Sequence, residues 1–435
     1  MSWSNIIFIL VLIASVVLFA RNIKRIIRNI KLGKSVDRRG NPSLRWKTML
    51  RVALGQSKMV VRPIAGIMHI LLYVGFVIIN IEVIEIIIDG VFGTHRVLSF
   101  MGVFYNFLIA SFEVLAILVL VACVVFFVRR NIQRIKRFWN PEMKGWPTTD
   151  ANLILIFEVI LMTAFLFMNA GDNLLQQRGE YAMAGSFPIS NLLTPLLINL
   201  NNESLLFLER FCWWVHIVGI LAFLNYLAIS KHLHIIFAFP NTYYSNLNPK
   251  GQLSNMSSVT KEVQLMLDPN ADPFANATSS KEAELFGAKD VLDLNWVQLL
   301  NAYSCTECGR CTSECPANVT GKKLSPRKIM MDVRDRAEEV GRGIDKNGVD
   351  YKDGKSLLND YITKEELWAC TSCNACTEAC PINIDPLSII VDLRRYLVME
   401  ESAAPTELNM VFTNVENNGA PWQFPATDRL KWKDE

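Results

Sequence analysis

The chain has 435 residues, of which 51% are hydrophobic and 20% charged, and its formal net charge is +3. This length allows two or three domains, and the hydrophobic share is high for an ordinary soluble protein. The near-neutral charge, with no recognition motif beside it, argues against a nucleic-acid-binding protein, so no nucleic-acid partner is expected.

Five apolar segments in residues 1–238 are long enough to cross a bilayer, which takes ~20 helical residues. They are residues 5–20, 63–88, 101–128, 151–170 and 205–237. The first has no basic region before it and no small-residue cleavage site after it, so it is interpreted as a retained anchor. The sequence therefore predicts five transmembrane helices in a domain that covers residues 1–238.

Basic residues are concentrated in two of the connecting segments. Residues 21–62 contain thirteen Lys or Arg and one acid, and residues 129–150 contain six against two acids. The positive-inside rule places both segments in the cytoplasm, beside anionic lipid head groups. The remainder of the chain after about residue 238 would then also be cytoplasmic, on a multi-pass protein of the inner (cytoplasmic) membrane.

Histidine is rare, and two of the five histidines, His69 and His216, lie inside apolar segments, where an ionisable side chain is costly and usually functional. His234 follows His216 by 18 residues, or five turns of a continuous helix, so both are expected on one face. His232 is expected on nearly the opposite side, at the interface. His69 and His234 lie near the cytoplasmic ends of their segments, which predicts the axial ligands of a b-type haem.

The alternative for these two histidines is a pair of buried, hydrogen-bonded side chains. His216 would need a facing ligand for a second haem, and the second segment offers Ile79 and Asn80 at that level. A second haem is therefore left open. Glu82 and Glu85 also lie near the outer end of this segment, where simple interfacial placement competes with a proton path or a quinone site.

Two cysteine motifs with the spacing C-x2-C-x2-C-x3-C-P occupy residues 305–316 and 370–381. This is the spacing of proteins with two [4Fe–4S] clusters, in which the fourth cysteine of each motif binds the other cluster. Crossed ligation is therefore expected, with one cluster on Cys305, Cys308, Cys311 and Cys380 and the other on Cys370, Cys373, Cys376 and Cys315. Zinc sites use separated pairs of ligands, and disulfides need an oxidising compartment, so both alternatives are weak.

The polar part of the chain is expected to contain a linker, a cluster domain and a tail. Residues 239–280 are rich in Asn, Ser and Pro, as linkers are. Residues 281–402 show helix signals, including Ser325 followed by Pro326. Further helices are expected at 281–293, 295–303, 364–370 and 386–401. Residues 403–435 are interpreted as a partner-binding tail that carries Trp422, Phe424 and Trp432. The predicted fold class is all-α: a five-helix transmembrane bundle followed by a cytoplasmic α-helical ferredoxin domain.

On these motifs, residues 1–238 resemble the haem b (gamma) subunit of respiratory nitrate reductases and the membrane subunit of heterodisulfide reductases. That family has two histidines on its fifth helix separated by seventeen residues, as His216 and His234 are. Its second helix has two histidines ten apart, where this chain has His69 and Ile79. The resemblance implies an inner haem on His69 and His234 and an outer haem that lacks one family ligand.

Residues 281–432 resemble the iron–sulfur subunits of heterodisulfide reductase and of glycerol-3-phosphate dehydrogenase, and the N-N-x-x-P-W stretch at 417–422 is shared with them. Those proteins, and the fused electron-transfer-flavoprotein:menaquinone oxidoreductases, continue into cysteine-rich CCG modules. The resemblance implies a cytoplasmic redox partner that carries a CCG domain or a flavin.

Together these features predict a respiratory oxidoreductase subunit. Electrons would pass between the cytoplasmic partner, two [4Fe–4S] clusters, haem b and a menaquinone-type quinone that serves as substrate. The alternative is a non-catalytic membrane anchor and electron wire for a partner that performs the substrate chemistry. A cluster-based sensor is disfavoured because it would not need histidines inside the membrane.

Overall fold

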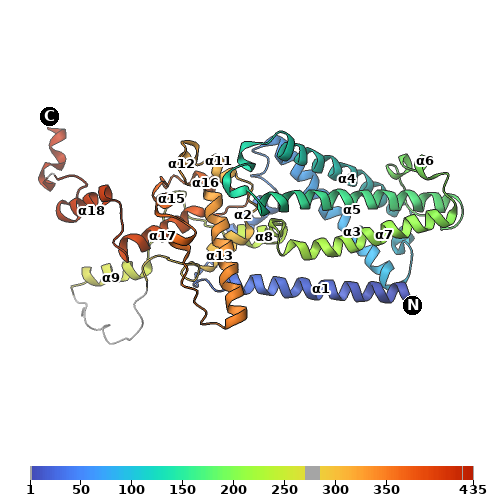
Figure 1. The fold of residues 1–435 in the computed structure, drawn as a ribbon. Helices are drawn as coiled ribbons and strands as arrows, with labels where there is room; N and C mark the ends of the chain where they lie inside the picture. Colours follow the sequence, from blue (N-terminus) through green and yellow to red (C-terminus); the bar gives the residue numbers. More distant parts are fainter. Residues whose placement is uncertain (1, 270–284, 424, 435) are drawn as a thin grey trace.

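The protein is elongated, with a helix bundle at one end, the helices that flank the cysteine motifs in the middle and the C-terminal residues at the other end (Figure 1). The computed structural model describes residues 2–269, 285–423 and 425–434. Within these ranges the regular structure is helical, and the β contacts are two isolated bridges, Lys34 with Asn295 and Leu358 with Ile362. The predicted all-α class, with five apolar helices followed by a helical cysteine-bearing part, is confirmed.

Five of the described helices are long and apolar enough to span a membrane, as the sequence predicted. They are α1 (Trp3–Ile30), α3 (Pro63–Phe92), α4 (Val103–Phe127), α5 (Trp146–Gln177) and α7 (Asn202–Leu227). A π turn (Val128–Ile132) extends α4, and two short helices, α2 (Pro42–Met49) and α6 (Thr194–Leu197), lie in the connections. These five helices make the chain a membrane protein.

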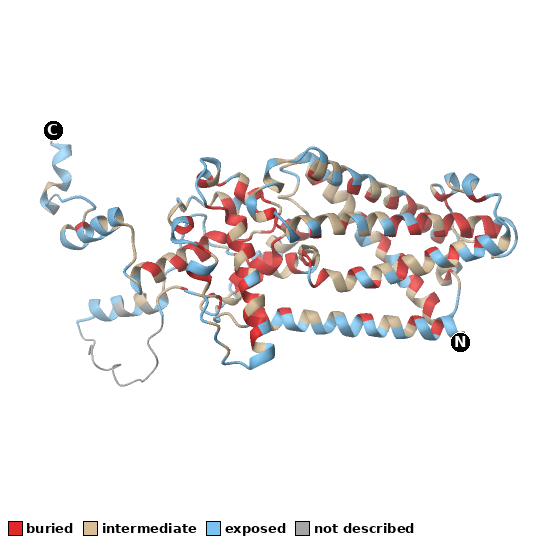
Figure 2. Ribbon diagram, in the orientation of Figure 1, coloured by how far each residue is buried: buried red, intermediate tan, exposed pale blue. Residues whose placement is uncertain are grey.

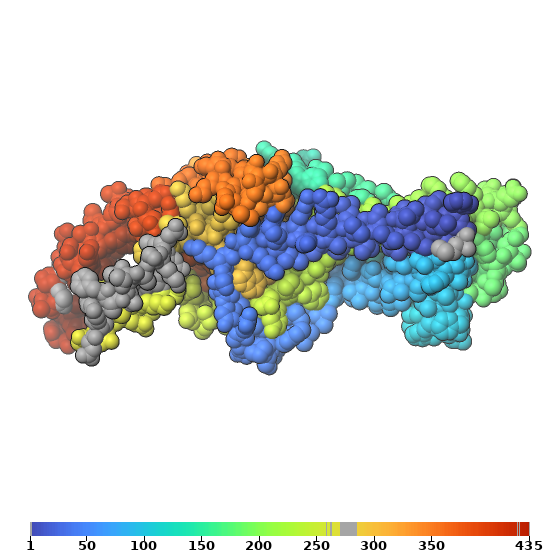
Figure 3. Space-filling model, turned by 90° about the horizontal axis from the view of Figure 1, so that it is seen from below, coloured from blue at the N-terminus to red at the C-terminus, as the bar shows by residue number. Residues whose placement is uncertain are grey.

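The bundle is built on α3, α4, α5 and α7, with α1 along one side (Figures 1 and 3). Its core is apolar and includes Ile109, Phe112 and Phe165, each at most 2% exposed. Most of α1 is exposed apart from contacts such as Phe8, which packs against Ile86 and Ile217 (Figure 2). Exposed apolar side chains on a spanning helix are what lipid would cover.

The fifth apolar segment departs from the prediction, because α7 ends at Leu227 and the chain turns before continuing. A 3-10 turn (Lys231–Leu233) leads into α8 (His234–Tyr243). Asp150, at the start of α5, accepts hydrogen bonds from Tyr226 Oη at 2.6 Å, Ser230 Oγ at 2.7 Å and the amide of Lys231 at 3.1 Å. The expectation of one continuous helix from residue 205 to 237 was wrong, because this carboxylate caps the broken turn from another helix.

The cysteine-bearing part consists of short helices around one long helix, α13 (Pro326–Asn347). In chain order the others are α9 (Ser257–Leu267), α10 (Trp296–Ser304), α11 (Arg310–Ser313), α12 (Pro316–Val319), α14 (Leu357–Asp360), α15 (Lys364–Trp368), α16 (Ala375–Ala379), α17 (Pro386–Met399), α18 (Thr406–Asn418) and a final 3-10 helix (Ala426–Lys433). The predicted capped helix after Ser325 and those at 295–303, 364–370 and 386–401 are confirmed within one or two residues. The helix expected at 281–293 is wrong where described, since 285–293 form turns, and 281–284 lie outside the described residues.

The hydrophobic core of the cysteine-bearing part is shared with the membrane helices. Ile26 and Ile30 of α1 and Phe237 of α8 belong to the same buried cluster as Leu299, Ile329 and Leu393. Asn29 at the end of α1 donates to Tyr303 Oη at 3.0 Å, and its side chain occupies the space where a Cβ on Gly341 would lie. The two parts are therefore packed together and not joined by a tether alone.

Candidate functional site

The two cysteine motifs fold into matching loops. In each, the residue two positions after the first cysteine has a left-handed backbone, Glu307 at φ 55° and Ser372 at φ 55°. The amide of each donates to the sulfur of that first cysteine, Cys305 or Cys370, at 3.4 Å. Amide hydrogen bonds to sulfur favour the thiolate and help to set the potential of an iron–sulfur cluster.

Four cysteines from both motifs line one hollow. Cys305, Cys308 and Cys311 of the first motif face it together with Cys380, the last cysteine of the second motif. Arg327, Met330 and Ile384 complete much of its wall. The structure therefore brings together the set that crossed ligation requires. Cys315 of the first motif in turn interacts electrostatically with Cys370 of the second, as does Cys373.

The chemistry of these thiols suits a cluster. All ten cysteines of the chain are free, which leaves the thiols available as ligands. Burial raises the pKa of Cys305 to about 12 and that of Cys380 to about 11, so these thiolates need a bound cation to balance them. No three His, Cys, Asp or Glu side chains in the described ranges are arranged to hold a single metal ion. Thiolates spread around a hollow fit a cube, in which each sulfur binds a different iron.

The histidines predicted as haem ligands meet at the cluster end of the bundle. His69 lies in the second turn of α3 and His234 is the first residue of α8, and their ring centroids are 6.3 Å apart. Two imidazoles on opposite sides of one metal, each bonded at about 2 Å, have ring centres roughly 6 Å apart. The spacing therefore fits a bis-histidine haem.

The Nδ1 atoms of the two rings have different surroundings, and the hydrogen bond of His234 fits metal ligation. The Nδ1 atom of His234 lies 3.2 Å from the carbonyl oxygen of Lys231, which leaves Nε2 free to act as a ligand. The Nδ1 atom of His69 is buried and has no hydrogen-bond partner in the described part of the chain. His232, expected on the far side, instead has its ring 5.4 Å from His234 because the helix is broken.

The other two histidines lie elsewhere. His216 is 1% exposed, with Nδ1 2.9 Å from the carbonyl oxygen of Leu161 and its ring 5.7 Å from Phe165. None of the other four histidines, all within the described residues, stacks against it. His95 packs on Tyr181 at 4.2 Å and lies 3.6 Å from Asp172, at the end of the bundle away from the cysteines. A second bis-histidine pair is therefore not assembled around His216.

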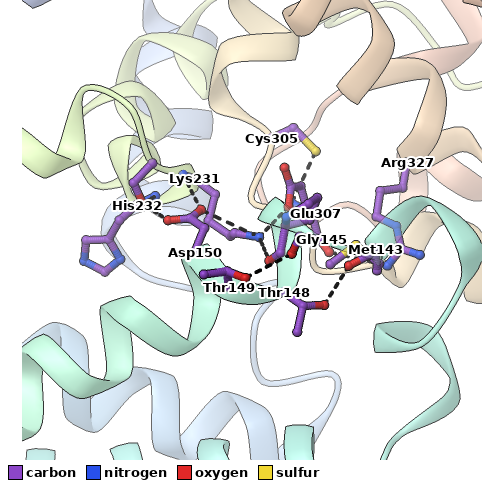
Figure 4. A network of polar contacts seen from close by, with 12 residues as sticks. Met143, Gly145, Thr148, Thr149, Asp150, Lys231, His232, Cys305, Glu307 and Arg327 are labelled. Carbon is purple, nitrogen blue, oxygen red and sulfur yellow. Dashed lines mark hydrogen bonds and ion pairs between the residues drawn. The ribbon is translucent and has the colours of Figure 1, made fainter.

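A buried ionic network joins the 3-10 turn before His234 (Lys231–Leu233), here called the histidine turn, to the first cysteine loop (Figure 4). Lys231 donates from Nζ to the carbonyl oxygen of Pro147 at 2.6 Å and forms an ion pair with Glu307, which stands between Cys305 and Cys308. Arg334 binds the other oxygen of Glu307 at 2.9 Å. Burial opposes ionisation of Glu307, but the two cations outweigh it and hold the pKa of Glu307 below its usual value.

A second contact between the membrane helices and the cysteine-bearing part is made by Arg327, which is fully buried beside the hollow. It donates to the carbonyl oxygen of Arg137 at 2.6 Å and to Glu142 at 2.7 Å, both in the connection between α4 and α5. Residues just before α3 make a third contact, since Lys58 donates to Asn383 at 3.0 Å and Arg62 pairs with Glu314 at 2.8 Å. The two basic segments therefore bind the cysteine loops, a role that their charge alone did not reveal.

The far end of the bundle, opposite the cysteines, holds another polar cluster, made by α3, α4, α5, α7 and the loops between them. Arg96 donates to Asp172 at 2.5 Å and to Asn169 at 2.9 Å, and Glu113 accepts from the amides of Ile189 and Ser190. Glu82 is 3% exposed and its Oε2 has no partner among the described residues. Glu82 and Glu85 are thus buried, in contrast to the interfacial alternative.

The tail extends away from the rest of the protein (Figure 1). Its aromatic residues Trp422 and Trp432 are 69% and 73% exposed. Phe424 lies outside the described residues. A role for the tail in partner binding stays a prediction.

Comparison with known proteins supports the chemistry of the cysteine motifs. Residues 304–384 match the family model of the 4Fe-4S dicluster domain. The chain is 30% identical to a "Probable iron-sulfur-binding oxidoreductase" of Bacillus subtilis over 99% of this chain and 61% of the relative. It is 28% identical to the "EtfAB:quinone oxidoreductase" of Syntrophomonas wolfei over 88% of this chain and 53% of that protein.

A third relative covers only the cysteine-bearing part. It is one of the subunits of the "Ferredoxin/F(420)H(2)-dependent CoB-CoM heterodisulfide reductase" of Methanosarcina acetivorans, 33% identical over 27% of this chain and 60% of the relative. The chain thus spans about half to three fifths of the length of these curated relatives. No solved structure matches it. The chain is accordingly a membrane protein that contains a 4Fe-4S dicluster domain.

Proposed function

We propose that the protein is a respiratory electron-transfer subunit of the cytoplasmic membrane, which links a cytoplasmic redox partner to a menaquinone-type quinone. Two [4Fe–4S] clusters and one haem b would supply the one-electron carriers when bound. The single observation that carries this proposal is the His69–His234 pair, whose ring centroids lie 6.3 Å apart at the end of the bundle that meets the first cysteine loop. The name of one relative, EtfAB:quinone oxidoreductase, supports both a protein redox partner and a quinone as the two reaction partners.

The residues of the chain have defined tasks in this proposal. One cluster is assigned to Cys305, Cys308, Cys311 and Cys380, and the other to Cys370, Cys373, Cys376 and Cys315. His69 and His234 are the proposed haem ligands. His216, with no facing histidine, is a ligand for a second haem only if a different side chain completes the pair. The positive-inside rule, applied to residues 21–62 and 129–150, supports a cytoplasmic position for the clusters.

Optical spectra of the purified protein test the haem. A dithionite-reduced sample loaded with iron and sulfide should show a b-type absorption band, and its absence would refute the haem assignment. His69→Ala should remove the low-spin signal because one axial ligand is lost. His95→Ala, which alters a histidine at the far end of the bundle, should leave that signal unchanged.

Iron analysis and electron paramagnetic resonance (EPR) test the crossed ligation. Cys315→Ala should weaken the cluster assigned to the second motif, and Cys380→Ala the one assigned to the first, each with a loss of up to about half of the bound iron. Cys123→Ala, inside α4, should keep full iron content. If Cys315→Ala removed the cluster of its own motif, the crossed assignment would be incorrect.

A second candidate is a non-catalytic anchor and electron wire. It is favoured by the match of residues 304–384 to a 4Fe-4S dicluster domain, which carries electrons, and the substrate chemistry would then belong to a partner with a CCG or flavin module. A co-purifying subunit of that kind would support it. Quinone reduction or quinol oxidation by the isolated chain would count against it.

A further inference from the structure

Lys231 touches both proposed cofactor sites. Its carbonyl oxygen lies 3.2 Å from Nδ1 of His234, and its ammonium group forms the ion pair with Glu307. Glu307 lies between Cys305 and Cys308, and Figure 4 shows the Lys231 and Glu307 side chains directed toward one another. One residue therefore connects the ring of a proposed haem ligand to the loop of the first cysteine motif.

The ion pair is buried on both sides. The side chains of Lys231 and Glu307 are 9% and 2% exposed, and that of Asp150, 3.8 Å from the ammonium group, is 3% exposed. A buried ion pair contributes little net stability, because removing both charges from water costs about as much as their attraction returns. Its effect here is on geometry, since two directional contacts fix one loop against one turn.

The ion pair also acts on the conformation of the first cysteine loop. Glu307 has a left-handed backbone, which is unfavourable for a residue with a side chain. Its carboxylate is held by Lys231 on one oxygen and by Arg334 on the other. The loop is thus held in its conformation from the membrane part as well as from α13.

Among the described residues, the second cysteine loop has no ion pair of this kind to the histidine turn, although Lys58, just before α3, donates to Asn383 beyond its last cysteine at 3.0 Å. Ser372 occupies the position equivalent to Glu307, and its hydroxyl is bonded by Arg394 of α17, within the cysteine-bearing part, at 3.4 Å. Cys373, beside it, is exposed, whereas its counterpart Cys308 in the first motif is half-buried. The repeat is therefore asymmetric: the first loop is joined to the histidine turn at Lys231 by a buried ion pair, and the second loop has the exposed cysteine.

We propose that Lys231 is a positioning residue that holds the first cysteine loop against His234, so that the cluster on Cys305, Cys308, Cys311 and Cys380 exchanges electrons with the haem. The cluster on Cys370, Cys373, Cys376 and Cys315 is the one that faces the soluble redox partner. Electrons pass one at a time between the soluble partner, the second cluster, the first cluster and the haem, in this order or its reverse, with no bond made or broken. This inference rests on the proposed function, because it requires both the haem and the clusters.

The test uses the full chain, purified with its cofactors, in four forms: wild type, Lys231→Met, Lys231→Arg and Lys250→Met. Lys250 pairs with Glu378 of the second motif at the surface, so its variant is a matched control. Haem reduction is followed by rapid mixing with dithionite, and the two clusters are followed by EPR during a redox titration.

Lys231→Met should slow haem reduction by about tenfold or more, since small displacements between reacting groups have large effects on rate. It should also shift the potential of one cluster and leave the other unchanged. Lys231→Arg should restore most of the rate, and Lys250→Met should match wild type. Unchanged haem reduction in Lys231→Met, or a shift confined to the cluster that Cys373→Ala removes, would overturn the proposal.

The proposed function and the positioning role of Lys231 fail in different ways. Wild-type protein with clusters but no haem would refute the proposed function. Fully loaded wild type together with an unaffected Lys231→Met variant would refute the positioning role alone. If Lys231→Met does not retain its cofactors, Glu307→Gln serves as the second variant, because it keeps the side-chain size and removes the charge that Lys231 binds.

Discussion

The two ends of the helix bundle both bury charged side chains, but they balance charge in different ways. At the cluster end three cations meet three carboxylates: Lys231, Arg327 and Arg334 with Asp150, Glu142 and Glu307. At the far end there are six buried carboxyl groups, Glu82, Glu85, Asp89, Glu113, Asp172 and Glu209. Two of them form ion pairs with a guanidinium group, Asp172 with Arg96 and Glu209 with Arg210. Each of the three carboxylates at the cluster end has an ion-pair partner, whereas four of the six carboxyl groups at the far end have none among the described residues.

The two networks differ because they join different elements of the protein. The cluster-end pairs cross between α5, the turn after α7, the first cysteine loop and α13, so they align elements from the two parts. The far-end groups hold loops that return into the bundle, since Glu113 accepts backbone amides of residues 189 and 190 and Asp89 accepts that of Arg96. Backbone groups near lipid need such partners because water is absent.

The largest effect is expected from Arg96→Met at the far end. Removing the guanidinium group leaves Asp172, Asn169 and Tyr105 without their donor in a buried site, which costs about 3–5 kcal/mol. Thermal unfolding in detergent should show a markedly lower midpoint. Arg342→Met, which removes an exposed Arg–Glu pair, should change stability by less than about 1 kcal/mol and serves as the control. Equal effects of the two variants would contradict a role for Arg96 in balancing the far end.

A smaller loss of stability is expected from Asp150→Asn at the cluster end. The amide keeps the size of the side chain but cannot accept all three hydrogen bonds at the break after α7, which costs about 1–3 kcal/mol. The loss should appear in thermal unfolding together with an altered haem spectrum, because the turn carries His234. Asp37→Asn, at the surface, should leave both measurements unchanged. An unaltered haem spectrum would contradict the claim that Asp150 positions His234 for the proposed haem.

The smallest effect is expected from Glu82→Gln. Its Oε2 has no hydrogen-bond partner among the described residues, so replacing the carboxyl by a neutral amide should shift stability by less than about 1 kcal/mol or raise it. Glu113→Gln is the matched control, because it weakens acceptors of two backbone amides and should cost about 1–3 kcal/mol. A larger loss for Glu82→Gln than for Glu113→Gln would mean that the far end depends on a charge at Glu82.

Much of the architecture was predictable because it depends on short-range patterns. Apolar segments of sufficient length predicted the five spanning helices, and Ser325 before Pro326 predicted the start of α13. The cysteine spacing predicted a domain for two clusters, which the match to the dicluster family model supports. Helix capping and ligand spacing act over a few residues, so they are visible in the chain itself.

The break after Leu227 was not predictable in this way. The residues there, Ala228 and Ile229, contain no glycine or proline, and the turn is stabilised by Asp150, more than 75 residues earlier in the chain. The break also moved His232 to the same side as His234, against the expectation from helical periodicity. Likewise, the basic segments predicted to lie on lipid hold the cysteine loops through Lys58, Arg62 and Arg137.

The sequence by itself determined which chemical groups are available: eight cysteines at cluster spacing, a few histidines in apolar surroundings, and five helices to carry them. The tertiary structure decided which of these groups meet. His69 and His234 are separated by 165 residues and become neighbours only when α3 packs beside the turn after α7. Lys231 and Glu307 pair across the boundary of the two parts. Such contacts depend on the packing of distant segments, which local residue preferences do not encode.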